Sequence, residues 1–458
     1  MSARSLIVTV LTLAAWAASL PAAEPAKPEI KGPLAALPSK PGAHVEGIKT
    51  LGDNAWLKLP PAAGDPRFDP PRQGTVRSWS TKICYDPALG GAIMTGEGGH
   101  GHVYKTGHYS DDVVLYDLYA NRWIFLYPGT HVPTLKQKME SGEYRVDDKQ
   151  LGMLVDKDGR AQPIAPISGH GAHNLSWDPA ARRFVWFGSA FTYFFHAPKD
   201  GDTSLFAKLR REKGLPEAVD CTFWVYDAAA DRFRPVAKSQ LGDARALAEV
   251  GRLSGHQVIQ YVDCRKLHFY PGDKADYWLD LAAMKMTVRP IANGEPRLVV
   301  GTGQHSGCYD PKRDRVYVGG GGIGTRQIPN DTPPGENFLY YDVKADKWVK
   351  PNPKGKFPLF WDIGTAFAAY DTVSDRLVIT LAQQRSRTKD VRFIYVYDPE
   401  KNEFEEPIPV PADFPVGLGH TFFCPELNVH LFNVAYDNAV GPWLAWRYRR
   451  APEVRKQP

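Results

Sequence analysis

The chain has 458 residues, of which 43% are hydrophobic, 12% aromatic and 23% charged, and its formal net charge is +5. This composition excludes a disordered chain, a collagen and a coiled coil, because it supplies enough apolar and aromatic residues for a large core. The mild, scattered charge gives no support for a nucleic-acid partner. The five cysteines include no Cys-x-x-Cys pair, which argues against a thiolate metal site and against a disulfide scaffold.

The N-terminal residues have the order of parts of a secretory signal peptide. Arg4 precedes an apolar run over residues 6–20, and small residues follow it. Because this run is too short to span a bilayer, we expect residues 1–23 to be removed on export and the mature chain to have no membrane span. The sequence does not separate periplasm, medium and cell surface. The Pro/Ala/Lys-rich residues 24–48 predict a flexible tether.

A half-motif recurs five times in the remaining residues, 49–450. An apolar strand ends in Tyr-Asp, or Leu-Asp in one copy, and a large apolar residue stands six positions after the Asp. In four copies an Asn or Asp stands two positions before the large residue. This spacing predicts a hairpin, because the polar residues can bond the turn and the large side chain begins the next strand. The copies are Tyr116-Asp117 to Trp123, Tyr226-Asp227 to Phe233, Leu279-Asp280 to Met286, Tyr341-Asp342 to Trp348 and Tyr397-Asp398 to Phe404.

A second half-motif consists of an inner strand, a turn and an apolar strand, and it adjoins the first one in each unit. Together the two halves form a four-stranded antiparallel unit, and radial repetition of such units is a β-propeller. Six copies of the second half-motif are recognisable, at residues 83–96, 175–188, 260–270, 307–320, 368–380 and 423–434.

The two ends of this region predict how the propeller closes. Trp56 has the context of an outer strand but no strand before it, whereas the last unit, residues 442–450, has no partner after its third strand. The N-terminal strand is therefore expected to complete the sixth sheet, which leaves no open edge. The sequence predicts one all-β domain over residues 49–450, a six-bladed propeller, followed by a tail at 451–458.

On these motifs the chain resembles the kelch family. The resemblance rests on the Tyr-Asp pairs, the Trp six residues on, and the diglycines Gly98-Gly99 and Gly319-Gly320. It implies the propeller fold that galactose oxidase also has. It does not carry over the activity of galactose oxidase, whose copper site needs a Tyr directly before a ligand His and a Cys–Tyr cross-link. The histidines near the inner strands here follow Ala, Gly or Gln.

The residues in excess of the repeat are concentrated in two classes of connection. They follow the second strand of a unit (97–110, 189–221 and 321–336) and the fourth strand (127–167, 235–253, 350–363 and 406–417). In a propeller both classes emerge on the same face. We therefore predict long loops on one face and a ligand site there, because loops on a rigid scaffold carry most binding and catalytic groups.

Four histidines stand near the starts of the inner strands: His173, His256, His305 and His420. The inner hairpins can be aligned on the turn Asp, with Tyr261 and Pro425 in its place in the third and sixth units. Each His then lies five residues before that position. Imidazoles that converge on the axis would suit Zn, Cu, Fe or Mn. A Gly-His at this point also resembles the kelch consensus, in which case the histidines have structural or hydrogen-bonding roles.

The predicted loops hold further candidate residues. Glu97 and His102 are candidates for acid–base catalysis, and His100 forms with His102 a His-x-His pair, a common spacing of metal ligands. Tyr193 lies in an aromatic run that basic residues follow, a combination that suits a sugar, although such a run can equally be the core of its own insertion. Three arginines are candidates for binding a carboxylate or a sulfate: Arg77, Arg252 and Arg326.

Three functions are compatible with this sequence. The first is a module that binds a carbohydrate or a protein on the loop-rich face. The second is a metal-dependent enzyme acting on a glycan, a lyase or an oxidase, with the histidines as ligands. The third is a sugar epimerase similar to the kelch-type mutarotases, in which an Arg holds an acid sugar. Because a fold does not choose between functions, binding is our prediction and catalysis stays open.

Overall fold

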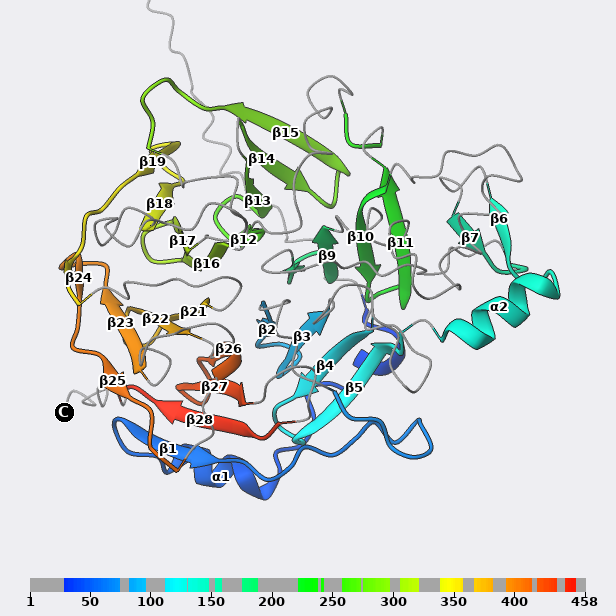
Figure 1. The fold of residues 1–458 in the computed structure, drawn as a ribbon, viewed down its shortest axis with the longest axis horizontal. Coiled ribbons are helices and arrows are strands. Elements are labelled where there is room, and N and C mark those ends of the chain that lie inside the picture. Colours follow the sequence, from blue (N-terminus) through cyan, green and yellow to red (C-terminus); the bar gives the residue numbers. More distant parts are fainter. Residues whose placement is uncertain are drawn as a thin grey trace, which may run out of the picture.

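The protein forms a ring of six antiparallel sheets around a central axis in a computed structural model (Figure 1). The six sheets confirm the six-bladed propeller that the sequence predicts. The structure describes residues 29–74, 82–95, 112–129, 131–147, 153–158, 175–187, 221–237, 240–242, 258–272, 275–296, 305–320, 338–356, 366–381, 393–413, 418–434 and 441–449. The predicted signal peptide and the predicted C-terminal tail lie outside these residues.

The first strand of each sheet lies nearest the axis, where it contacts the first strands of both neighbouring sheets. The first sheet consists of β2 (Cys84–Asp86), β3 (Gly91–Thr95), β4 (Val113–Asp117) and β5 (Arg122–Tyr127). The second consists of β8 (Leu175–Asp178), β9 (Arg183–Phe187), β10 (Cys221–Asp227) and β11 (Arg232–Ala237). The third consists of β12 (Gln260–Val262), β13 (Leu267–Pro271), β14 (Ala275–Asp280) and β15 (Lys285–Pro290).

The remaining three sheets follow the same order. The fourth consists of β16 (His305–Asp310), β17 (Arg315–Gly320), β18 (Phe338–Asp342) and β19 (Lys347–Val349). The fifth consists of β21 (Ala366–Asp371), β22 (Arg376–Leu381), β23 (Phe393–Asp398) and β24 (Glu403–Phe404), with the short strands β20 (Lys354–Gly355) and β25 (Ile408–Pro409) paired to it. The sixth consists of β26 (Leu418–Cys424), β27 (Val429–Val434), β28 (Trp443–Arg447) and β1 (Ala55–Lys58).

The outermost strand of the sixth sheet comes from the N-terminal part of the chain. β1 pairs antiparallel with β28, and Trp56 lies opposite Trp446. Arg447, which is 6% exposed, donates hydrogen bonds to the carbonyls of Ile48 and Leu427, both at 3.0 Å. One buried guanidinium thus ties the segment before β1 to the body of the sixth sheet.

The segment between the predicted signal peptide and β1 is not the flexible tether that the composition of residues 24–48 predicts. The part of it that the structure describes contains η1 (Gly32–Leu34) and α1 (Ala43–Lys49). In α1, Val45 and Ile48 are fully buried and belong to the core shared by the first and sixth sheets. The tether prediction was wrong because two apolar residues at helical spacing are enough to seat a Pro- and Ala-rich segment on an existing core.

The hydrophobic core lies between neighbouring sheets. One cluster joins the first and sixth sheets, and further clusters join the second to the third, the third to the fourth, the fourth to the fifth and the fifth to the sixth. Central strands such as β4 and β28 are buried at every residue. Strands buried on both faces are nearly continuous apolar runs, which is why the sequence shows them so clearly.

The hairpin turns contain the bonds that the repeated motif predicts. In six turns a Tyr hydroxyl donates to an Asp or Asn five residues later, whose φ lies between 48° and 59°. Asp and Asn adopt this left-handed region more readily than most other non-glycine residues. The pairs are Tyr116–Asn121, Tyr226–Asp231, Tyr309–Asp314, Tyr341–Asp346, Tyr370–Asp375 and Tyr397–Asn402.

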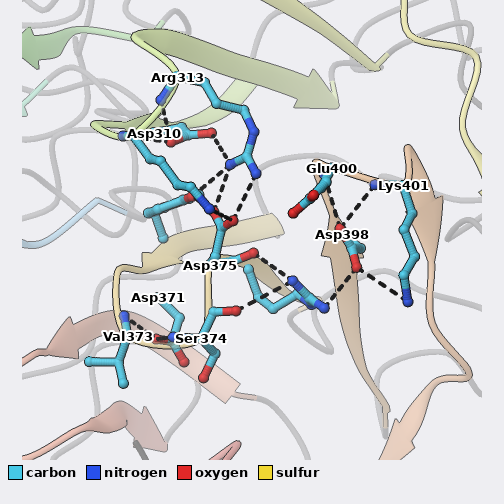
Figure 2. A network of polar contacts seen from close by, with 12 residues as sticks. Asp310, Arg313, Asp371, Val373, Ser374, Asp375, Asp398, Glu400 and Lys401 are labelled. Atoms are coloured by element: carbon cyan, nitrogen blue, oxygen red, sulfur yellow. Dashed lines mark hydrogen bonds and ion pairs between the residues drawn. The ribbon is translucent and has the colours of Figure 1, made fainter. Parts of the chain in front are cut away.

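We call the end of the propeller that carries these turns, such as residues 311–314 and 372–375, the turn face. Charged pairs there connect neighbouring sheets (Figure 2). Arg313 of the fourth sheet donates to Asp310 at 3.1 Å and to Asp375 of the fifth sheet at 2.6 and 2.7 Å. The hydrogen bonds from Arg313 are the main cause that lowers the pKa of Asp375. The turn face is therefore fastened by ion pairs between blades.

Two further elements lie outside the ring of sheets: α2 (Val132–Glu140) and a hairpin of β6 (Arg145–Asp147) with β7 (Met153–Val155) (Figure 1). In the part of the chain that the structure describes, neither α1 nor α2 is long and apolar enough to cross a bilayer. The connections at the end opposite the turn face contain most of the residues outside the described ranges, so the predicted loop-rich face is not tested.

Candidate functional site

Most of the site residues that the sequence predicts lie outside the described residues. They are Glu97, His100, His102, Arg77, Tyr193, Arg252, Arg326, His173 and His256. His305 opens β16, where its backbone is described. His420 lies in β26 and is fully buried. The structure therefore tests only the strand positions of His305 and His420, and the other predicted residues stay predictions.

The strand register corrects the alignment that makes the four histidines equivalent. Asp310, the last residue of β16, lies opposite Arg315, whereas the residues at this position in the third and sixth sheets are Val262 and Cys424. The alignment that placed Tyr261 and Pro425 there is off by one residue. A shift of one residue points a strand side chain to the other face of the sheet.

On the corrected register the histidines divide into different positions. His173 and His305 keep the spacing of five residues, but His256 lies six residues and His420 four residues before the strand end. Among the side chains that the structure describes, no three His, Cys, Asp or Glu residues are grouped as a metal site would require. Metal binding by the predicted histidines stays a prediction, which elemental analysis of the mature protein can test.

The register also reveals a ring of six aromatic side chains that the sequence analysis missed. Each innermost strand has a large ring one residue before its end, and all six rings line one axial cavity of about 310 Å³. The six residues are Tyr85, Trp177, Tyr261, Tyr309, Tyr370 and Phe423. Four of them stand directly before the turn Asp in the sequence, and this aromatic-Asp pair was the signal that could have predicted the ring.

Polar groups anchor several of these rings and fix their positions. The Tyr85 hydroxyl donates to Glu426 of the sixth sheet at 2.9 Å, and the Tyr309 hydroxyl donates to Asp314 at 2.5 Å. Trp177 donates its indole N–H to Asp86 of the first sheet. Burial raises the pKa of Tyr85 and Tyr309 well above the ordinary value for a phenol. These phenols stay protonated at neutral pH, so they hold the wall rather than act as bases.

The cavity wall continues with the residues one position earlier in each strand, which include two thiols, a hydroxyl and an amide: Cys84, Ser176, Gln260, Cys308, Ala369 and Phe422. Each innermost strand is an edge strand of its sheet. The backbone N–H and C=O groups on its unpaired side therefore also face the axis. Burial raises the pKa of the Cys84 and Cys308 thiols, which are therefore neutral. The wall thus combines aromatic surface and neutral hydrogen-bonding groups with two carboxylates at the ends of their strands, Asp86 and Asp263.

One cation lies in this wall. Lys82, two residues before β2, is 9% exposed, and its Nζ donates to the Ile259 carbonyl and, at 2.9 Å, to Gln260 Oε1. Burial lowers the pKa of Lys82. The signal in the sequence is weak: a lysine directly precedes the apolar Ile83 and the start of β2 at Cys84, and only the structure shows that its side chain is buried.

The arrangement can hold a small polar molecule in contact with aromatic edges, hydroxyls and one amine. Its volume lies at the lower end of the range that is typical of small-molecule sites, roughly 300–1,000 Å³. A comparison with models of protein families finds no match, and a search of curated proteins finds no similar sequence.

Proposed function

We propose that this protein is an exported kelch-type propeller that binds a small carbohydrate-like ligand in its axial cavity. The observation that supports the proposal is the composition of the wall: all six innermost strands contribute an aromatic ring to one cavity of about 310 Å³, and five of them also contribute a smaller residue. Sugars present apolar C–H faces together with hydroxyls, and this wall offers aromatic surface together with hydrogen-bonding groups. The residues predicted on the loop-rich face would extend this site.

A volume of about 310 Å³ limits the ligand to roughly the size of a mono- or disaccharide. A protein partner could reach only the rim of such a cavity, so a small ligand is the better supported of the two predicted classes. The described residues offer no observation that favours the lyase, oxidase or epimerase alternatives. We therefore propose binding and leave the catalytic candidates as predictions.

Calorimetric titration of the mature protein with a panel of mono- and disaccharides tests the proposal. Ala368 lines the cavity and is partly exposed, so Ala368→Phe should fill it and abolish the binding of any sugar that the wild type binds. The matched control is Ala283→Phe, at an exposed turn position outside the cavity, which should leave binding unchanged. A sugar that binds equally well to Ala368→Phe would show that the axial cavity is not the site.

Export is tested separately by expressing the full chain and measuring the mass of the protein recovered outside the cytoplasm. Removal of the predicted signal peptide would give a mature N-terminus near residue 24. An intact N-terminus on protein that stays in the cytoplasm would contradict this part of the proposal.

A further inference from the structure

Lys82 sets a chemical requirement on the ligand of the axial cavity. It stands four residues before Asp86, the end of β2, which corresponds to roughly 13 Å of extended chain. Both Lys82 and Asp86 line the cavity. The amine and the turn face therefore lie at opposite ends of the wall, and the aromatic ring lies near the turn end.

The groups that face Lys82 from the strands around it are neutral. Its two hydrogen-bond acceptors are the Ile259 carbonyl and the Gln260 side-chain amide. The titratable groups within electrostatic reach are Cys84, Cys308 and His268. Burial raises the pKa of both thiols and lowers the pKa of His268 to about 3, so all three are uncharged at pH 7. No carboxylate contacts Lys82 in the part of the chain that the structure describes.

A buried ammonium group with only neutral partners is unfavourable, because it has lost its hydration without gaining an opposite charge. An ammonium also has three N–H donors, and the two acceptors of Lys82 use two of them. The described residues therefore offer Lys82 Nζ two neutral acceptors, but neither an opposite charge nor a third acceptor.

A second polar group in the wall also lacks a partner. Thr421 in β26 lines the cavity and is 5% exposed, and its Oγ1 has no hydrogen-bond partner among the residues that the structure describes. β26 contacts β2 in the ring of innermost strands, so Thr421 and Lys82 belong to adjacent sheets. A hydroxyl without a partner and a cation with only neutral partners, in the wall of one cavity, match a ligand that carries both an acid group and hydroxyls.

We infer that the ligand of the axial cavity is a small carboxylate-bearing molecule of the sugar-acid class, whose carboxylate pairs with Lys82 Nζ. This inference rests on the proposed function and adds the ligand's charge to it. The carboxylate would accept the third N–H of the ammonium, and a ligand hydroxyl would bond Thr421. The aromatic ring at the turn end would contact the carbon skeleton.

The test compares acids with their neutral counterparts in calorimetric titrations of the mature protein at pH 7. The probes are D-galacturonate against D-galactose and D-glucuronate against D-glucose. We expect at least one acid to bind at least tenfold more tightly than its neutral sugar. Lys82→Met should remove this difference, whereas Lys82→Arg, which keeps the charge, should retain part of it. Thermal unfolding of each variant shows whether it is folded.

The pH dependence adds a readout that a structural lysine would not change. The carboxylate stabilises the ammonium form, so binding should take up protons and weaken as the pH rises through the lowered pKa of free Lys82. Neutral sugars that bind in the cavity as tightly as the acids, to wild type and Lys82→Met alike, would overturn the inference and leave the proposed function standing. If neither acids nor neutral sugars bind, both fail. Borohydride trapping of a sugar on Lys82 would overturn the ion pair in favour of an imine.

Discussion

Buried charged side chains have different partners at the two ends of the innermost strands. At the turn face the charges are paired: Arg313 lies between Asp310 and Asp375, and Arg376 pairs with Asp398 at 2.7 Å (Figure 2). At the other end Lys82 is almost as buried, but its partners are neutral oxygens. Among the described residues, the same ring of strands thus carries a charge-balanced end and an end where one positive charge has no opposite partner.

This difference separates polar groups that stabilise the fold from polar groups that are available to a ligand. A paired buried charge fixes the geometry of neighbouring sheets. Removing one partner leaves the other charge buried without an opposite charge, which lowers the free energy of unfolding. A buried charge without an opposite partner makes no such contribution, and a fold retains it at the expense of stability. The sign of the stability change on mutation therefore distinguishes the two ends.

The largest effect should come from lowering the pH, which protonates a buried histidine directly behind the cavity wall. His268 is fully buried, packs against Tyr261 with ring centroids 5.2 Å apart and the ring planes tilted by 60°, and has a pKa lowered to about 3, mainly by burial. Because the unfolded chain binds this proton from about pH 6.5 downward, stability should fall as the pH falls from 6.5 to 3, by roughly 4 kcal/mol in total.

About 2 kcal/mol of this loss should occur between pH 6.5 and 5, above the range in which an ordinary carboxylate takes up its proton. Urea unfolding of wild type and His268→Phe at these two pH values measures it. The variant should lose most of the dependence in this interval. An equal slope in both proteins would show that another group takes up the proton.

The next largest effect should come from breaking the charge balance of the turn face. Arg313→Ala leaves the fully buried Asp310 without its ion pair, and Asp375 without its bidentate partner. We expect a loss of about 3 kcal/mol in the free energy of unfolding. Lys312→Ala is the matched control, because Lys312 also pairs with Asp375 but is 60% exposed, and it should cost under about 1 kcal/mol. Equal losses in urea unfolding would contradict the assignment.

The sequence predicted the sheets better than it predicted the site, for a physical reason. Local turn chemistry, such as Tyr116 with Asn121, indicates where strands end. The spacing of that motif finds five units, and the inner-hairpin motif adds the sixth. The axial wall instead depends on register across separate sheets. Two misaligned residues, Tyr261 in place of Val262 and Pro425 in place of Cys424, made the four histidines equivalent and hid the aromatic ring. A bulge in β26, between Leu418 and Thr421, cannot be seen in the sequence at all.

Composition also misled the prediction at the N-terminus. A Pro- and Ala-rich segment has too few apolar residues to form a core by itself. It can still add to an existing core, as α1 does with Val45 and Ile48. The surface that receives α1 belongs to strands that are far away in the chain, so no local pattern indicates it.

At the end of the innermost strands that contains Lys82, replacing this lysine should stabilise the protein. Lys82→Met replaces a buried cation that has only neutral partners with an apolar chain of similar length. Its free energy of unfolding should rise by about 1–2 kcal/mol at pH 7, the opposite sign to Arg313→Ala. Lys82 is charged in the folded state only below its lowered pKa. The gain should therefore shrink as the pH rises and Lys82 loses its proton in the folded state. Destabilisation by Lys82→Met in urea unfolding would place Lys82 among the structural charges.

The smallest expected effect comes from comparing two tyrosines that belong to the circle of six aromatic side chains in the cavity wall. Tyr370 donates its hydroxyl to Asp375 and accepts from Arg313 at 3.2 Å, so it belongs to the charge network of the turn face. The structure gives the Tyr261 hydroxyl no hydrogen bond within the described residues. Tyr370→Phe should therefore cost about 1 kcal/mol in urea unfolding, and Tyr261→Phe should stay within about 0.5 kcal/mol. Sugar binding should reverse this order, because a hydroxyl that the fold does not use is the one that a ligand can engage. If both variants lose stability equally, the Tyr370 hydroxyl contributes nothing to the charge network of the turn face beyond what any ring hydroxyl at this level contributes.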